Sequence, residues 1–202
     1  MNGRRRNPHA AGKAAKVLPT LDQQRLLDHV ADKRHGARNR VMVLLSFKAG
    51  LRACEIAGLS WSMVNDANGE VCDEIHIQRH IAKMGSARRI PCHKILKRAL
   101  RRLHAEQGKP RSGPVCRSER GGALTAKSVV NWFAAQYAEL GLEGCSSHSG
   151  RRTMITAAAR AIPKAGGSLR DVQELAGHRS LSTTERYIVG DRDAQRRMIG
   201  LL

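Results

Sequence analysis

The chain has 202 residues, 41% of them hydrophobic, which suffices for one packed domain and excludes wholesale disorder. Its 36 lysines and arginines outnumber 17 acidic residues and give a net charge of +19 at pH 7. Because self-repulsion of this size opposes compaction, it indicates a polyanionic partner, and nucleic acid is the usual one. An anionic membrane surface is the alternative, but no apolar run approaches the roughly 18 residues of a spanning helix, and no signal-peptide pattern opens the chain.

The chain begins with a basic segment, residues 1–18, that contains no acidic residue and no apolar period. We expect this segment to be a flexible arm. Directly after it, Thr20 and Gln23 have the spacing of a capping box, and Leu21 begins an apolar helical period that runs to Val30. The first helix is therefore predicted to have Thr20 as its N-cap.

Two further helical segments are predicted before the middle of the chain. The first covers residues 38–49, and Gly50 supplies its C-terminal stop. Residues 51–58 make a second, short helical turn. Leu59 and Trp61 follow it and are predicted to anchor the hydrophobic core.

Between residues 73 and 91 the period of the hydrophobic residues changes from that of a helix to that of a strand. Ile75 and Ile77 alternate with polar residues, residues 84–86 make a glycine-containing turn, and an extended run resumes at residues 89–91. This pattern predicts a small β-hairpin or sheet.

Helical periods fill the rest of the chain. Residues 95–103 carry one apolar stripe with basic residues on the remaining face. Further helices are predicted after a cap at Thr125, near residues 151–161, over residues 168–176 and over residues 183–202. The expected fold class is therefore mainly α with a small antiparallel β-hairpin or sheet (α+β).

Basic side chains on and around the 95–103 helix are candidates for DNA contact, since the global charge favours a polar face that meets phosphates. A merely solvated face is the alternative. The predicted DNA-binding residues are Arg88, Arg89, Lys97, Arg98, Arg101, Arg102 and Lys127.

Five short patterns occur in order along the chain. An arginine follows a helix-ending glycine, a lysine stands at the tip of the predicted hairpin, and a His-x-x-Arg opens a helix. A histidine then follows a second helix-ending glycine, and a tyrosine comes nine residues later. Taken singly, such an arginine is usually a surface charge and such a tyrosine a packing aromatic. The residues of the ordered set are Arg52, Lys83, His148, Arg151, His178 and Tyr187.

This ordered set resembles the catalytic domain of the tyrosine recombinases, the phage integrase family, over roughly residues 18–189. The resemblance implies a tyrosine-type site-specific DNA recombinase, of integrase or invertase type, that cuts and rejoins DNA through a covalent 3′-phosphotyrosine. Two alternatives stay open. The same covalent step without exchange of partners gives topoisomerase-like DNA relaxation, and a relic of the fold would bind DNA without cutting it.

The chemistry explains why an arginine pair and a tyrosine belong together. The planar guanidinium groups of Arg52 and Arg151 suit bidentate binding of the non-bridging phosphate oxygens, where charge gathers in the transition state. Tyr187 is the predicted nucleophile, and its attack on phosphorus gives a covalent intermediate that keeps the bond ready for religation.

The resemblance also implies roles for the remaining residues of the set. Lys83 protonates the leaving 5′ oxygen, and His148 accepts the tyrosine proton. His178 hydrogen-bonds the phosphate or steers the nucleophile. Glu55, on the same helical face as Arg52, is expected to orient the basic cluster.

No metal ion and no cofactor are predicted. Acidic residues do not cluster as Mg²⁺ ligands do, and the arginines, lysine and histidines supply the positive charge that a metal would bring. Five cysteines stand singly without a Cys-x-x-Cys pair, which argues against a zinc module and against a disulfide framework.

The expected organisation is a basic arm (1–18), a catalytic domain (19–189) and a C-terminal tail (190–202). The tail is a candidate for docking on a neighbouring protomer, with folding back onto its own core as the alternative. Most members of the family carry a further helical domain, which clamps the duplex, before this point. A single-domain enzyme, a truncation and a degenerate relic are the three explanations for its absence here.

The expected partners are double-stranded DNA and further copies of the chain, as a dimer or tetramer on DNA. An accessory DNA-bending protein is compatible with this scheme, and a membrane is not expected. The predicted location is the cytoplasm, in association with the nucleoid, for a protein of assumed bacterial or phage origin.

Overall fold

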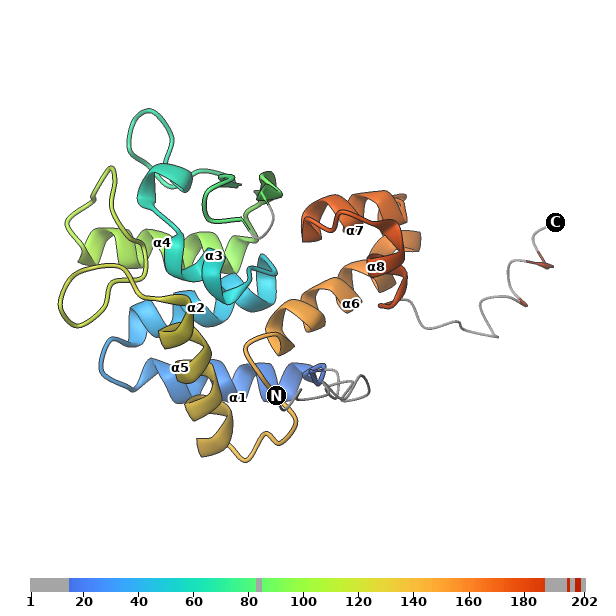
Figure 1. Ribbon diagram of the computed structural model, residues 1–202, viewed down its shortest axis with the longest axis horizontal. Coiled ribbons are helices and arrows are strands. Elements are labelled where there is room, and N and C mark those ends of the chain that lie inside the picture. Colours follow the sequence, from blue (N-terminus) through green and yellow to red (C-terminus); the bar gives the residue numbers. More distant parts are fainter. Residues whose placement is uncertain (1–14, 83–84, 188–195, 197–198, 201–202) are drawn as a thin grey trace, which may run out of the picture.

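The computed structural model describes residues 15–82, 85–187, 196 and 199–200, and in these it is mainly helical with one small sheet. Figure 1 shows two groups of elements, α1–α5 with the sheet on one side and α7–α8 on the other, joined by α6. The elements are α1 (Thr20–Ala31), α2 (Gly36–Lys48), α3 (Ala53–Gly58), the 3-10 turn η1 (Trp61–Met63), β1 (Glu74–Ile77), β2 (Arg88–Pro91), α4 (Lys94–Glu106), α5 (Ala126–Glu139), α6 (Ser149–Ala165), α7 (Leu169–Ala176) and α8 (Leu181–Glu185).

The hydrophobic core lies in the larger group. It takes residues from α1 to α5 and from both strands, and Leu26, Leu44, Trp61, Ile75 and Phe133 are fully buried in it. Burial of side chains of this size supplies the main driving force for folding. The predicted core role of Leu59 and Trp61 is confirmed, because neither is exposed to solvent.

A second, smaller cluster joins the helices of the other group. Ile155 of α6 packs on Val172 and Ala176 of α7, and Tyr187 lies against the same cluster after α8. The C-terminal elements therefore have their own apolar centre, and α6 connects it to the larger core.

The start of α6 packs directly on α2, and this contact depends on a glycine. A Cβ atom at Gly150 would lie 2.2 Å from the Ser46 hydroxyl and 2.8 Å from the Phe47 ring. The absence of a side chain therefore lets the two helices approach closely, which fixes the position of Arg151, the next residue of α6.

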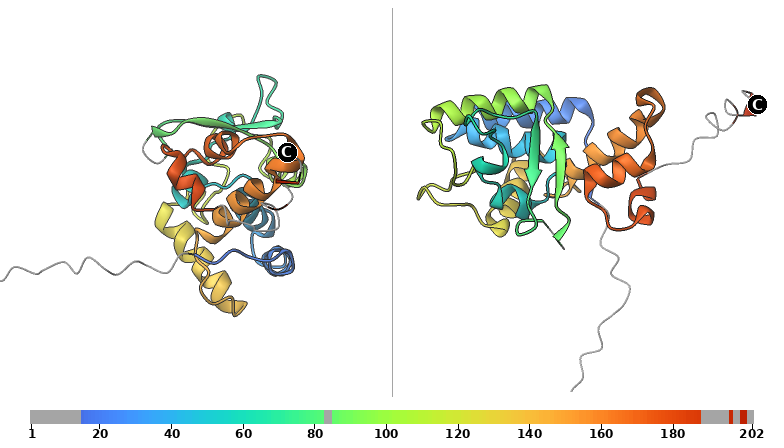
Figure 2. Two further views of the ribbon diagram at one scale, coloured as in Figure 1. Left: turned by 90° about the vertical axis from the view of Figure 1, so that its right-hand side faces the viewer. Right: turned by 90° about the horizontal axis from the view of Figure 1, so that it is seen from above.

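The predicted hairpin is confirmed as an antiparallel pair of strands. Ile75 of β1 lies opposite Ile90 of β2, and both are buried. β2 packs against α7 of the other group (Figure 2), so the strand reaches across from one group to the other. Lys83, expected at the tip of the hairpin, lies outside the described residues.

The predicted capping box at the start of α1 is wrong. The N-cap is Pro19, Thr20 is already helical, and no side chain caps the helix. Leu18 is the reason, since its side chain is buried and its amide donates to the Thr153 hydroxyl, which fixes the chain one residue earlier. The side chain of Gln23 instead donates to the Leu18 carbonyl.

The end of the predicted flexible arm is held in place. The amide of Lys16 donates to the carbonyl of Gly144 at 3.1 Å, and Leu18 is buried, whereas residues 1–14 lie outside the described residues.

The last predicted helix, 183–202, is largely untested. α8 begins earlier, at Leu181, and ends at Glu185, and most of the later residues are outside the described part.

The remaining helix signals are confirmed. The Thr125 hydroxyl accepts from the amide of Ser128 at the start of α5, and Ser168 and Asp171 form a capping box on α7. Gly50 and Gly177 follow α2 and α7 with φ values of +63° and +62°. These left-handed conformations favour glycine, which explains both stops. In the described part of the chain, no helix has the length and apolarity needed to cross a membrane.

We predict that Gly150→Ala lowers the free energy of unfolding by about 1–3 kcal/mol, because the added methyl group overpacks the contact between α6 and α2. Urea unfolding followed by circular dichroism measures the change. Gly122→Ala is the control, since a Cβ there meets no atom within 4 Å. Equal unfolding midpoints for the two variants would contradict this account of the helix contact.

Candidate active site

Arg52 and Glu55 are held together by the start of α3. Arg52 is the N-cap, and its amide donates to Glu55 Oε2 at 2.8 Å while its Nη1 donates to Oε1 at 3.1 Å. The Glu55 side chain is fully buried, and that of Arg52 is 17% exposed. The turn through Gly50 thus brings a guanidinium to the surface directly beside a buried carboxylate.

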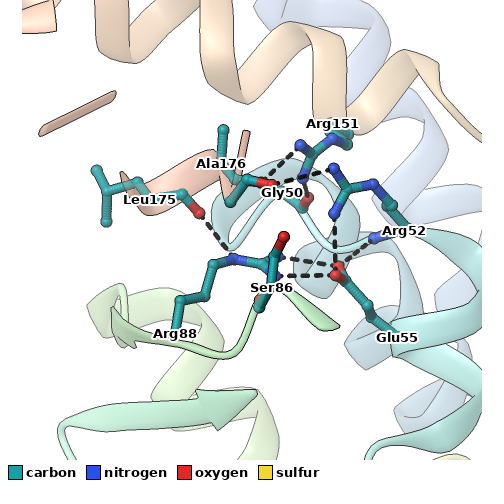
Figure 3. Close-up of polar contacts among 9 residues, drawn as sticks. Gly50, Arg52, Glu55, Ser86, Arg88, Arg151, Leu175 and Ala176 are labelled. Carbon is teal, nitrogen blue, oxygen red and sulfur yellow. Dashed lines mark hydrogen bonds and ion pairs between the residues drawn. The ribbon is translucent and has the colours of Figure 1, made fainter. Parts of the chain in front are cut away.

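Arg151 joins the ends of two other helices. It lies in the first turn of α6, almost fully buried, and donates to the Gly50 carbonyl at 2.7 Å and to the Ala176 carbonyl at 2.6 Å. These carbonyls follow α2 and end α7, where backbone acceptors have no intrahelical partner. Figure 3 shows the side chain between them, next to that of Arg52.

A third guanidinium, that of Arg88 on β2, completes this cluster. Its Nη1 and Nη2 each donate to one Glu55 oxygen at 2.9 Å, and its Nε donates to the Leu175 carbonyl at 3.0 Å (Figure 3). Its side chain is only 5% exposed.

This position differs from the DNA-backbone contact expected for Arg88, because the guanidinium faces a buried carboxylate rather than solvent. A signal was present in the sequence. Residues two apart in a strand share a face, so Arg88 lies on the side of the buried Ile90, while Arg89 points the other way and is 72% exposed.

The cluster keeps an excess of positive charge, since three guanidinium groups surround one carboxylate. Burial alone would raise the pKa of Glu55, but Arg88 and Arg52 hold it below its ordinary value. Burial, followed by the charge of Arg52, lowers the pKa of Arg151 to about 10, so this residue is still cationic at pH 7. The arrangement is suited to binding an anion.

His178 and Tyr187 lie beside this cluster. His178 follows the left-handed Gly177, and its Nδ1 is 2.9 Å from the Thr184 hydroxyl of α8. Its ring stacks on that of Tyr187, with centroids 5.8 Å apart, and the Arg152 guanidinium lies 5.6 Å from the centre of the tyrosine ring. Helices α7 and α8 thus hold a histidine and a tyrosine next to the arginines.

The environment of His178 disfavours its protonated form. Burial and the charges of Arg151, Arg52 and Arg88 lower its pKa from 6.5 to about 4. The imidazole is therefore neutral at pH 7, and can accept a proton on one nitrogen while donating from the other.

His148 stands at the N-cap of α6, one helical turn before Arg151, and its side chain is exposed. Of the sequence-predicted set, the structure thus brings Arg52, Glu55, Arg151, His178 and Tyr187 together. Within the described ranges, no group of three or more His, Cys, Asp or Glu side chains is placed to hold a metal ion.

A basic groove runs next to the cluster. A cavity of about 580 Å³ lies between β2 and the C-terminal end of α7, and Arg89, Arg170, Arg179 and His178 contribute to its lining. Of the other predicted DNA-binding residues, Lys97 donates to Asp73 and is mostly covered. The exposed ones are Arg98, Arg101, Arg102 and Lys127.

The sequence model of the phage integrase family matches residues 16–192. The chain belongs to the phage integrase family. It is 30% identical over 158 residues to the tyrosine recombinase XerC of Pelobacter propionicus, covering 77% of this chain and 49% of that protein. It is 30% identical over 188 residues to XerC of Actinobacillus succinogenes, covering 88% and 59%. The chain therefore spans about half the length of these curated relatives.

Solved structures of the family share the fold. The Tn1549 transposon integrase in complex with transposon right end DNA superposes with a TM-score of 0.71 at 17% identity, covering 92% of this chain and 65% of that one. XerA recombinase gives a TM-score of 0.69 at 20% identity, covering 92% and 64%. The predicted fold class, mainly helical with a small antiparallel sheet, is confirmed.

We predict that His178 titrates with a pKa of about 4, because it is partly buried among three guanidinium groups. Since 6.5 is its ordinary value, the unfolded chain binds more protons between these limits, and the free energy of unfolding falls as the pH drops from about 6.5 towards 4. NMR titration of the ring proton, assigned with His178→Gln, measures the pKa. A midpoint near 6.5 would show that the arginines do not act on this ring.

Proposed function

We propose that this chain is a site-specific DNA recombinase that cuts and rejoins DNA through a covalent bond to Tyr187. The observation that carries the proposal is the convergence of a tyrosine and a neutral histidine on a buried cluster with excess guanidinium charge. Binding alone requires positive charge but no nucleophile. Membership of the phage integrase family supports the same reading.

The proposed reaction uses the guanidinium groups for charge stabilisation. Arg52 and Arg151 keep N–H groups that are not engaged in the bonds described above, and these are assigned to the non-bridging oxygens of the scissile phosphate. The Tyr187 oxygen attacks phosphorus, a phosphorus–oxygen bond to the tyrosine forms, and the bond to the 5′ oxygen breaks. Religation is the reverse of this step.

Proton transfers complete the assignment. Lys83 is proposed to give the leaving 5′ oxygen its proton, and His148 to take the proton of Tyr187. His178 is proposed to hydrogen-bond the phosphate, which its neutral state and its stacking on Tyr187 support. Glu55 is proposed to orient the arginines, since it accepts from Arg52 through both side chain and backbone.

DNA is the proposed partner. The net charge of +19 and the basic groove beside His178 support it, since release of counterions from DNA favours such a surface. Structures with the same fold include a lambda integrase dimer bound to a core site and XerH bound to its difH substrate. We therefore propose that the chain acts as a dimer or tetramer on DNA and that an accessory DNA-bending protein can take part. The proposed location is cytoplasmic and nucleoid-associated.

The proposed organisation of the chain is a basic arm (1–18), a catalytic domain (19–189) and a C-terminal tail (190–202). The continuity of the packing from α1 to α8 supports treating 19–189 as one catalytic unit. Docking of the tail on a neighbouring protomer belongs to the same proposal.

The proposal predicts a protein–DNA adduct that survives denaturant and needs no added metal. A library of nicked duplexes with randomised sequence traps it, because loss of the short 3′ fragment prevents religation, and sequencing of the adducts identifies the site. Tyr187→Phe should abolish the adduct. Tyr137→Phe is a matched control, since these are the only two tyrosines, and the Tyr137 hydroxyl is buried without a hydrogen-bond partner among the described residues.

Undiminished adduct in Tyr187→Phe would refute the proposed nucleophile, and so would its loss in Tyr137→Phe alone. Binding without any adduct in the wild type would favour the non-cutting reading. Relaxation of supercoiled plasmids without recombinant product on paired sites would favour the topoisomerase-like reading.

A further inference from the structure

We propose that Arg88 is a positioning residue for DNA cleavage, which occupies the Glu55 carboxylate so that Arg52 remains available to the scissile phosphate. The inference rests on the proposed function and assigns a role to a residue outside the predicted catalytic set. Its starting point is the unequal sharing of one buried carboxylate between two guanidinium groups, which Figure 3 shows.

Arg88 makes the stronger of the two pairings. It donates to both Glu55 oxygens at 2.9 Å, in the fork geometry that gives the strongest guanidinium–carboxylate pairs. The guanidinium of Arg52 donates to a single oxygen at 3.1 Å, and its Nη2 has only a long contact of 3.5 Å with the Gly177 carbonyl. Its side chain is also the more exposed of the two, 17% against 5%.

This sharing matters because a carboxylate competes with a phosphate for the same donors. Without Arg88, the buried Glu55 would keep only the bonds from the amide and Nη1 of Arg52, and Arg52 would be the only cation still bonded to it among the described residues. Arg52 would then be drawn into a fork with Glu55 and withdrawn from the phosphate. One cation is enough to neutralise a buried carboxylate that only stabilises the fold, whereas Glu55 is bonded to two guanidinium groups.

Arg88 also fixes the strand against the end of α7. Its Nε donates to the Leu175 carbonyl, and a Cβ atom at Gly177 would lie 3.0 Å from its Cδ. The side chain therefore fits between β2 and the residue that precedes His178. The side chain that occupies Glu55 through its two Nη atoms thus also contacts the end of α7, whose last carbonyl accepts from Arg151.

The test compares Arg88→Met with the double variant Arg88→Met/Glu55→Gln on a duplex recovered from the adduct library. We expect Arg88→Met to slow single-turnover cleavage by about 10–100-fold, the range found when hydrogen-bond partners of metal-binding residues are removed, with a much smaller change in the duplex Kd. The double variant should cleave faster than Arg88→Met, because no carboxylate remains to capture Arg52, but more slowly than the wild type, because Glu55 no longer orients the arginines. A glutamine can still accept the amide of Arg52 at the start of α3.

Arg25→Met is the control for loss of an ion-paired arginine, since Arg25 pairs with Asp22 on α1 and should leave rate and affinity unchanged. Arg88→Lys keeps the charge without the fork and should cleave at an intermediate rate. All rates are measured below the unfolding temperature of each variant.

A double variant that folds but stays as slow as Arg88→Met would overturn the proposal, because Arg88 would then act only through Leu175. Wild-type cleavage rates in Arg88→Met would overturn it as well. So would failure of the double variant to fold, since it removes Arg88 and its carboxylate together and the defect would then lie in the packing of β2 against α7. Absence of any wild-type adduct would instead count against the proposed function.

Discussion

The side chain of Glu55 has no contact with solvent, and a buried carboxylate costs several kcal/mol unless charged hydrogen bonds compensate for it. Its partners come from the start of α3 and from β2, elements that are separate in sequence. Because Arg88 also reaches the end of α7, this one ion-paired cluster joins the larger core to the C-terminal helices. Together with α6, which packs on both α2 and α7, that junction positions the candidate site.

The helix ends around the cluster explain how the fold tolerates so many buried guanidinium groups. Arg151 is satisfied by the carbonyls of Gly50 and Ala176, acceptors that lie where α2 and α7 end. The negative ends of the dipoles of these two helices also favour a cation at the position of Arg151. The charge left over is directed to the side on which His178 and Tyr187 lie, so structural satisfaction and anion binding come from the same groups.

Local signals in the sequence predicted much of this arrangement. Gly50 and Gly177 end helices because their left-handed backbone favours glycine, and such stops can be predicted from the sequence alone. Long-range contacts could not be predicted in this way. Thr20 is not a cap because Leu18 is bonded to a distant helix, and Arg88 is buried by a partner that lies 33 residues earlier in the chain. The order of the motifs predicted the site, whereas the sharing of Glu55 between Arg52 and Arg88 could be found only from the structure.

The most direct test of the account is the chemical identity of the residue that holds the DNA. Mass spectrometry of a trapped adduct, after digestion by nuclease and protease, locates the nucleotide on one side chain. The account predicts a single modified peptide, with the 3′ phosphate joined to the oxygen of Tyr187. Attachment to another residue would contradict it, however well the arginine cluster is placed.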